Sequence, residues 1–138
     1  MLSIFILFLL ILVMFTKQIS INNDEVRKSD MKLANVDISE PKFAINNSSK
    51  KIYITAKEGN FLNKDKILLK ENVKFKSHDF SIETETVIFD RSKQTAESKT
   101  KSLFKSKNST ILSDGFDIHD RGNKIIFYGN SFIVLKWD

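Results

Sequence analysis

The stretch "NVKFKSHDFSIET", residues 72–84, decides the fold class because apolar and polar residues alternate along it. Val73 and Phe75 share one face of an extended chain, and lysines occupy the other face. After the polar break "SHD" the alternation resumes with Phe80 and Ile82. Alternation over short runs is typical of half-buried β-strands. The stretch therefore predicts two strands separated by a turn.

The same pattern continues on both sides of this stretch, from Pro41 to the last residue. Runs such as "KFAI", "KIYITA", "GFDIHD" and "KIIFY" alternate between segments rich in Asn, Asp, Gly and Ser, which are turn signals. No window has the spacing of an amphipathic helix. We therefore expect residues 41–138 to form an all-β domain.

The apolar positions also repeat. Three series recur at intervals of 27 to 29 residues: Ile54, Ile82 and Ile111; Phe61, Phe89 and Phe116; and Phe75, Phe104 and Ile133. Each repeating unit of this length is too small to bury its own apolar face. The units must therefore stack, either as a sandwich with a shared interior or as an elongated solenoid.

The N-terminal residues differ sharply from this domain. "MLSIFILFLLILVMF" is uncharged and apolar, and residues 1–21 are long enough for a transmembrane anchor, at about 1.5 Å per residue across a core of about 30 Å. A cleaved signal peptide would need a basic start and small residues at a cleavage site, and neither is present. A buried core helix would need other helices to pack against, and the rest of the chain predicts none. We therefore expect residues 1–21 to form an uncleaved membrane anchor. Residues 22–40 are expected to be a polar linker. Basic residues follow the anchor, which by itself favours a cytoplasmic domain.

Composition excludes several functional classes. The chain of 138 residues carries a net charge of +5, but its lysines are dispersed among acidic and amide residues, which is typical of solvated strand faces and not of nucleic-acid binding. An attraction to anionic lipid head groups remains open. The absence of cysteine excludes disulfides, thiolate nucleophiles and zinc sites with cysteine ligands.

An acidic cluster in "SDGFDIHD", residues 113–120, could bind a metal or perform acid–base chemistry. The alternation directs Asp117 and His119 to the solvent face, and it places Asp114 and Asp120 in turns at opposite strand ends. These side chains are therefore not expected to converge, and we predict no catalytic residues, no metal and no cofactor. A surface metal site that uses His119 is the alternative.

Two segments resemble the LptC family, the membrane-anchored periplasmic component of the lipopolysaccharide export machinery. The first is "SIETETVIFDRSKQTAESKTKSLFKSKNSTILSDGFDI", residues 81–118, and the second is "KIYITAKEGNF", residues 51–61. The resemblance implies an open β-jellyroll, built from the repeat of antiparallel strands that LptA and OstA proteins share, behind one transmembrane helix. It also implies a single-pass inner-membrane protein with its bulk in the periplasm. The chain looks about one repeat shorter than the longer members.

The resemblance further implies a lipopolysaccharide export adaptor without enzymatic activity. Such a protein receives lipopolysaccharide from an inner-membrane ABC transporter and passes it along an apolar trough to the periplasmic bridge protein LptA. The residues expected to face the lipid are Phe43, Ile45, Ile52, Ile54, Phe75, Ile82, Phe89, Phe104, Phe116, Ile118 and Phe127. The edge expected to pair with a partner comprises Gly115, Phe132, Ile133, Val134, Leu135 and Trp137.

Other functions remain open from the sequence. The chain could be an envelope-anchored β-repeat scaffold that carries no lipid. It could also be a soluble bridge module similar to LptA, without its own hand-off from the transporter. A third alternative is an envelope metal-dependent hydrolase that uses His119 and Asp120.

Overall fold

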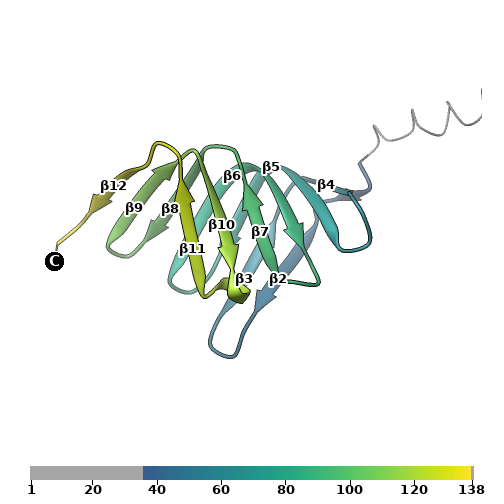
Figure 1. Cartoon of the computed structure of the whole chain (residues 1–138), viewed down its shortest axis with the longest axis horizontal. Coiled ribbons are helices and arrows are strands. Elements are labelled where there is room, and N and C mark those ends of the chain that lie inside the picture. The colour runs from purple at the N-terminus through teal and green to yellow at the C-terminus, as the bar shows by residue number, and fades with distance from the viewer. Residues whose placement is uncertain (1–35, 138) are drawn as a thin grey trace, which may run out of the picture. The chain divides into compact units, whose positions relative to one another are not determined.

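A computed structural model of the chain describes residues 36–137, and these residues form an all-β domain (Figure 1). Twelve strands join through antiparallel pairing into one continuous hydrogen-bonded sheet. The expected anchor at residues 1–21 lies outside the described residues, as does most of the expected linker. Within residues 36–137 no helix has the length and apolar character needed to cross a membrane.

The strands are short except for two. In chain order they are β1 (Ile38–Ser39), β2 (Lys42–Asn46), β3 (Lys51–Thr55), β4 (Glu58–Phe61), β5 (Lys66–Lys76), β6 (Phe80–Asp90), β7 (Thr95–Ser98), β8 (Ser102–Ser106), β9 (Ser109–Ser113), β10 (Gly115–His119), β11 (Lys124–Tyr128) and β12 (Phe132–Leu135). A 3₁₀ turn, η2 (Asp120–Gly122), joins β10 to β11. Pairing begins at Ile38, opposite Gly59, three residues before Pro41.

The hairpin of β5 and β6 divides the sheet into two layers. The first half of β5 pairs with β4 and its second half with β3, while the first half of β6 pairs with β8 and its second half with β7. The first layer therefore has the order β1-β4-β5-β6-β7-β10-β11, and the second has the order β2-β3-β5-β6-β8-β9-β12. The register of β5 shifts where Glu71 and Asn72 adopt positive φ angles of 58° and 54°, which bends the strand from one layer to the other.

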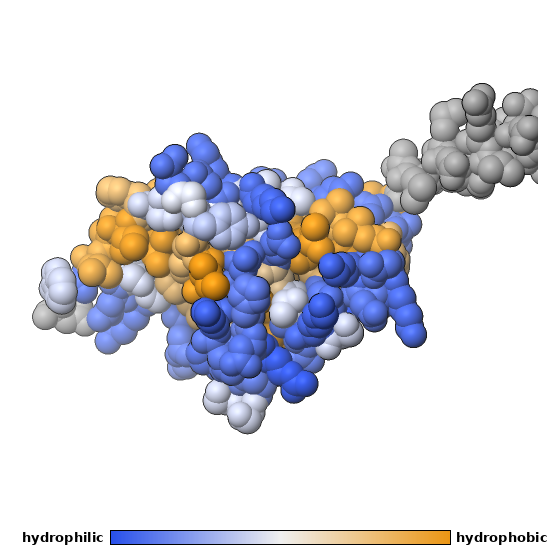
Figure 2. Space-filling model, viewed as in Figure 1, coloured by the Kyte–Doolittle hydropathy of each residue, from blue (hydrophilic) through white to orange (hydrophobic). Residues whose placement is uncertain are grey.

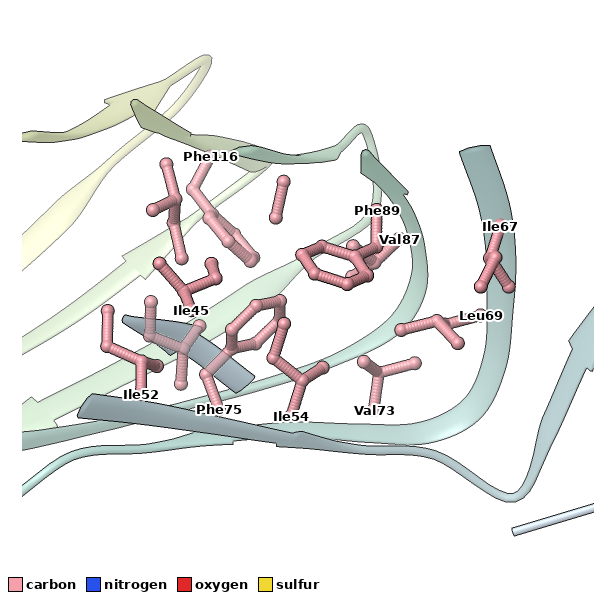
Figure 3. Packing of buried hydrophobic residues seen from close by; sticks show 13 residues of the cluster. Ile45, Ile52, Ile54, Ile67, Leu69, Val73, Phe75, Val87, Phe89 and Phe116 are labelled. Carbon is pink, nitrogen blue, oxygen red and sulfur yellow. The ribbon is translucent and has the colours of Figure 1, made fainter. Parts of the chain in front are cut away.

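The two layers enclose a packed apolar core, which decides between the sandwich and the solenoid in favour of a shared interior (Figure 3). Phe75 of the second layer meets Phe116 of the first with ring centroids 5.4 Å apart and nearly perpendicular planes. Phe43 and Phe89 make a second contact between the layers at 5.4 Å. Side chains in such an interior stabilise the fold through the apolar area that they remove from water.

Two turns hold the layers together at one rim of this core. The Asn47 side chain, between β2 and β3, donates to the carbonyl oxygen of Arg121 at 2.8 Å and to the side chain of Asn123 at 3.1 Å. Gly122 has a φ of 87°, and a Cβ there would lie 2.5 Å from Ile52. The expected turn at Asp120 is confirmed. It takes positive φ at Asp120 (48°) and Arg121 (50°) as well as at Gly122, and it closes this rim because no side chain at Gly122 separates it from Ile52.

Candidate functional site

An unbroken row of apolar side chains crosses the inner face of the second layer from β2 to β12. Residues that pair directly across antiparallel strands present their side chains on the same face. The register therefore aligns seven residues, which we call the inner ladder: Phe43, Ile54, Phe75, Ile82, Phe104, Ile111 and Ile133.

The inner ladder explains most of the repeat in the sequence. Two of the three predicted series lie entirely on it. In the third series, Phe61 and Phe89 flank Ile67 on the inner face of the first layer. The equivalence of Phe116 with Phe89 is wrong, because Phe116 pairs with Ser98, whereas Ile118 and Phe89 both pair with Ala96. Ile118 follows Phe89 by 29 residues, so the true interval matches the other series.

Burial along the inner ladder falls toward β12. Phe75 and Ile82 are fully buried, Phe104 and Ile111 are half-buried, and Ile133 is 57% exposed. The first layer ends at β11, whereas the second continues through β9 to β12. The last inward side chains of the second layer therefore have no opposing strand among residues 36–137. We call this part of the domain, β9 and β12, the open end.

Three phenylalanines mark the boundary between the closed core and the open end. Phe104 stacks on Phe80 at 5.5 Å and meets Phe127 of β11 edge-on at 5.3 Å. All three are half-buried and pack against the core. Because Phe104 and Phe127 belong to different layers, their contact is where the layers last touch before the open end.

The structure divides the eleven residues expected to face lipid into two groups. Eight lie in the closed core, where they are at most 2% exposed: Ile45, Ile52, Ile54, Phe75, Ile82, Phe89, Phe116 and Ile118. Phe43, Phe104 and Phe127 are only half-buried. In this closed arrangement Phe104 and Phe127 are partly exposed next to the open end, and the buried eight would contact solvent only if the layers separated.

The residues expected to form the partner edge are mostly brought together on β12. Phe132, Ile133, Val134 and Leu135 are all exposed, and Trp137 beyond them is 88% exposed. Figure 2 shows hydrophobic surface gathered at this end of the domain. Within residues 36–137, β12 pairs only with β9, so its other edge presents unpaired backbone groups. An apolar, unpaired edge is a surface that accepts a further strand.

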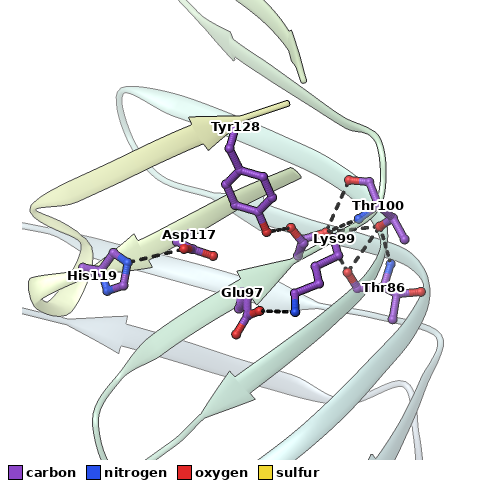
Figure 4. Close-up of polar contacts among 8 residues, drawn as sticks. Thr86, Glu97, Lys99, Thr100, Asp117, His119 and Tyr128 are labelled. Carbon is purple, nitrogen blue, oxygen red and sulfur yellow. Dashed lines mark hydrogen bonds and ion pairs between the residues drawn. The ribbon is translucent and has the colours of Figure 1, made fainter. Parts of the chain in front are cut away.

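Gly115, in contrast, lies inside the sheet and not at its edge. It is buried in β10, which pairs with β7 on one side and β11 on the other. A Cβ at this position would lie 2.5 Å from both the carbonyl oxygen of Ser98 and the ring of Tyr128. The missing side chain allows the Tyr128 hydroxyl to donate to that carbonyl oxygen (Figure 4). Gly115 therefore keeps β10 in register and has no free edge to offer a partner.

The environment of Tyr128 also changes its acidity. Its pKa is raised, first because the hydroxyl is partly buried and then because the carboxylates of Asp117 and Glu97 lie nearby. The hydroxyl thus stays protonated and remains a donor to Ser98.

A recess of about 390 Å³ lies where β11 turns into β12. Asp114 fixes this turn, because its carboxylate accepts the backbone N–H of Asn130 at 2.8 Å and packs against Gly129, which has a φ of 79°. The recess is lined by Lys101, Leu112, Ser113, Asp114, Asn130, Ser131 and Phe132. Two exposed side chains of the open end, Leu112 and Phe132, form part of its wall.

A buried polar row beside the inner ladder was not foreseen from the sequence. Thr84, Ser102 and Ser113 pair across β6, β8 and β9 on the inner face, and all three are at most 6% exposed. The hydroxyl of Thr84 lies 3.1 Å from that of Ser98 and 2.8 Å from that of Thr100. The hydroxyl of Ser102 joins this network at 3.3 Å from that of Thr84, whereas the buried hydroxyl of Ser113 has no hydrogen-bond partner among residues 36–137. Hydrogen bonds offset the cost of burying the other hydroxyls, and they hold the chain where it passes from the first layer to the second.

The acidic cluster is dispersed over the domain. Asp117 and His119 lie on the outer face of β10, where the imidazole Nε2 is 3.6 Å from a carboxylate oxygen (Figure 4). Asp114 holds the turn before β12, and Asp120 begins the 3₁₀ turn at the other end of β10. Among residues 36–137, no three His, Cys, Asp or Glu side chains gather where they could share a metal ion.

Comparisons with known protein families and with curated proteins find no match to this chain.

Proposed function

We propose that this protein is a lipopolysaccharide export adaptor whose inner ladder conducts acyl chains from a membrane transporter to a soluble bridge protein. The observation that carries the proposal is the unbroken inner ladder, which begins in the closed core and reaches the surface at Ile133. The resemblance of residues 81–118 to the LptC family supplies the cargo, lipopolysaccharide, and the partners.

The chemistry of the inner ladder suits transfer better than storage. Phenylalanine and isoleucine bind an acyl chain through buried area, which is non-directional, at about 25 cal/mol per Å². An acyl chain that moves from one residue of the inner ladder to the next exchanges one apolar contact for a similar one. No single position therefore binds the acyl chain strongly. The ladder contains no charged or amide side chain that would interrupt this path.

The open end is suited to the transfer of lipid to the bridge protein. A bridge protein that adds a strand to the free edge of β12 would extend the second layer and continue the inner ladder beyond Ile133. The layers could then part at the contact of Phe104 with Phe127 to admit cargo from the core. In this proposal residues 1–21 anchor the protein in the inner membrane, the domain lies in the periplasm, and an ABC transporter delivers the lipid.

A second candidate is an envelope scaffold that carries no lipid. The observation that favours it is the packing of the core, because eight of the eleven inward residues are closed off from solvent. A soluble bridge module similar to LptA is a variant of the first proposal, in which the cargo does not come directly from a transporter.

Lipid that co-purifies with the full chain tests the proposal. Ile133→Asp places a charge on the inner ladder, and Val134→Asp places the same charge on the opposite face of the same exposed strand. We expect mass spectrometry to find lipopolysaccharide with the wild type and with Val134→Asp, and to find it strongly depleted with Ile133→Asp. Equal lipid content in all three proteins, or none in any, would favour the scaffold.

A further inference from the structure

Lysines dominate the outer face of the second layer, the face turned away from the inner ladder. The strand register places five lysines outward on β2, β3, β5 and β8, and we call this surface the lysine face: Lys42, Lys51, Lys74, Lys76 and Lys105. Glu83 is the one acidic residue at the outward positions of these paired strands. All five lysines are exposed.

The charge of the lysine face is not neutralised by ion pairs within residues 36–137, although Glu40 lines a recess with Lys42 and Lys74, and Glu85 lines another with Glu83. None of the five lysines forms an ion pair with a carboxylate inside residues 36–137. Glu83 pairs across the strands with Lys74, yet the two side chains make no ion pair. Lys51 lies over the ring of Tyr53 at 5.1 Å, which leaves its charge uncompensated.

The outer face of the first layer has a different character. Its outward strand positions carry four carboxylates, Glu58, Asp90, Glu97 and Asp117, against three lysines, Lys66, Lys70 and Lys124. The excess of lysine is therefore specific to one layer and does not simply follow from the net charge of the chain.

Apolar side chains share the lysine face and continue it toward β12. Leu103, Leu112 and Phe132 pair in one row, and Val134 pairs with Thr110 in the next. Leu112, Phe132 and Val134 are exposed, as is the ring of Tyr53. Between Tyr53, Lys74, Lys76, Ser81 and Glu83 the face is hollowed by a recess of about 430 Å³.

We propose that the lysine face binds the surface of an anionic phospholipid bilayer. Lysines attract anionic head groups, and their flexible stems let the ammonium groups reach phosphates while the backbone lies further out. Exposed Leu, Phe and Val side chains beside them can enter the interfacial region, as the apolar sides of membrane-surface elements do. Charge complementarity selects a bilayer with negative lipids over a neutral one. This proposal does not depend on the proposed function, because the inner ladder and the lysine face are opposite faces of the second layer.

Site-specific fluorescence on the full chain tests the proposal, because the chain contains no cysteine that would compete for a label. Thr110→Cys carries an environment-sensitive dye on the lysine face, between Lys105 and Val134. Thr95→Cys carries the same dye on the outer face of the first layer, opposite Asp90. The protein is returned from detergent to vesicles of phosphatidylcholine alone or mixed with phosphatidylglycerol.

We expect the dye at residue 110 to report an apolar environment in the vesicles with phosphatidylglycerol, to lose this signal in high salt, and to show little of it with phosphatidylcholine alone. The dye at residue 95 should report water in every case. The triple change Lys74→Glu, Lys76→Glu and Lys105→Glu should weaken docking by more than about 100-fold, since losing each lysine near an anionic surface costs roughly fivefold and each new carboxylate adds repulsion. The matched change Lys66→Glu, Lys70→Glu and Lys124→Glu alters the net charge equally and should leave the signal in place.

Equal signals at residues 95 and 110 would overturn the proposal, as would equal effects of the two triple changes. A signal at residue 110 that appears with lipopolysaccharide micelles but not with phosphatidylglycerol would also overturn it, because the lysine face would then bind cargo phosphates and not a bilayer. Five of the six substituted lysines are exposed and Lys70 is half-buried, so both variants should keep their β-structure, which circular dichroism checks.

Discussion

The ring of Phe104 in β8 lies 5.3 Å from the ring of Phe127 in β11 at an angle of 70°, and this contact joins the two layers where the first layer ends. Behind it the core is closed, and beyond it the inner ladder continues to Ile133 without an opposing strand. If the proposed transport of acyl chains requires the layers to part, we expect them to part at this contact.

Substitutions on either side of this contact should differ in their cost. Phe75→Ala removes a fully buried ring and should lower the free energy of unfolding by about 3–5 kcal/mol. Phe104→Ala should cost only about 1–3 kcal/mol, because that ring is already half-exposed. Urea denaturation measures both.

A double-mutant cycle of Phe104 and Phe127 should give a coupling of about 0.5–1.5 kcal/mol, and additive effects would show that the rings do not hold the layers together.

Gly115→Ala should destabilise the domain by about 1–3 kcal/mol, because the added Cβ collides with a backbone oxygen and the Tyr128 ring. Gly59→Ala is the matched control, since a Cβ there meets its neighbours at 3.4 Å or more. Thermal unfolding compares the two variants. If Gly59→Ala proves as costly as Gly115→Ala, the close approach of Tyr128 to Ser98 is not what requires glycine.

Asp90 should make stability depend on pH in acid. Its carboxylate accepts the N–H of Lys93 and the hydroxyl of Ser92, each at 2.9 Å, and these bonds lower its pKa below the ordinary value of 3.8. A lowered pKa means that the folded state favours the ionised form of Asp90, so the carboxylate stabilises the folded domain at neutral pH. This stabilisation begins to be lost as the pH falls below 3.8, the ordinary pKa. It is gone once the pH is below the lowered pKa of the folded state.

Asp90→Asn tests this expectation. The variant should be less stable than the wild type at neutral pH, and the difference should shrink as the pH falls. Urea denaturation across the acid range measures it, and Ser92→Ala, which removes one of the two donors, should show a smaller effect of the same sign. A difference that does not change with pH would mean that the amide is simply a poorer acceptor.

How far the sequence predicts this structure is clearest along β5 and β6. Alternation assigned Val73, Phe75 and Ile82 to the inner face correctly, because a strand with one buried face fixes its own side-chain parity. The polar segment "KEN", residues 70–72, gave a turn signal, but nothing in it showed that the strand bends there and continues, since neither Glu71 nor Asn72 is glycine although both adopt positive φ. The passage of both strands from one layer to the other could therefore not be predicted.

The candidate site was predictable in its parts but not in their exposure. The repeat placed Phe75, Phe104 and Ile133 in equivalent positions, and all three lie on the inner ladder. Their burial differs because the first layer ends before the second does, and that depends on pairing between distant strands. The same distant pairing determines that Gly115 lies inside the sheet.

The free edge of β12 can be tested by proline substitutions at two consecutive positions. Successive N–H groups of a strand point to opposite sides, so only one of Ile133→Pro and Val134→Pro removes a bond to β9. We expect the other variant to keep its β circular dichroism and yet lose co-purification with the bridge protein. Should both folded variants still retain that protein, strand addition at β12 is not the mode of docking.

The central claim is that acyl chains travel along the inner ladder, and photo-crosslinking in cells tests it most directly. Ile133 and Val134 are consecutive on β12 and 57% and 41% exposed, but only Ile133 faces the inner ladder. A photo-reactive residue at position 133 should give lipopolysaccharide adducts that disappear when the transporter cannot hydrolyse ATP, and position 134 should give few. Equal yields from the two positions, or adducts at position 133 that persist without transport, would contradict the account.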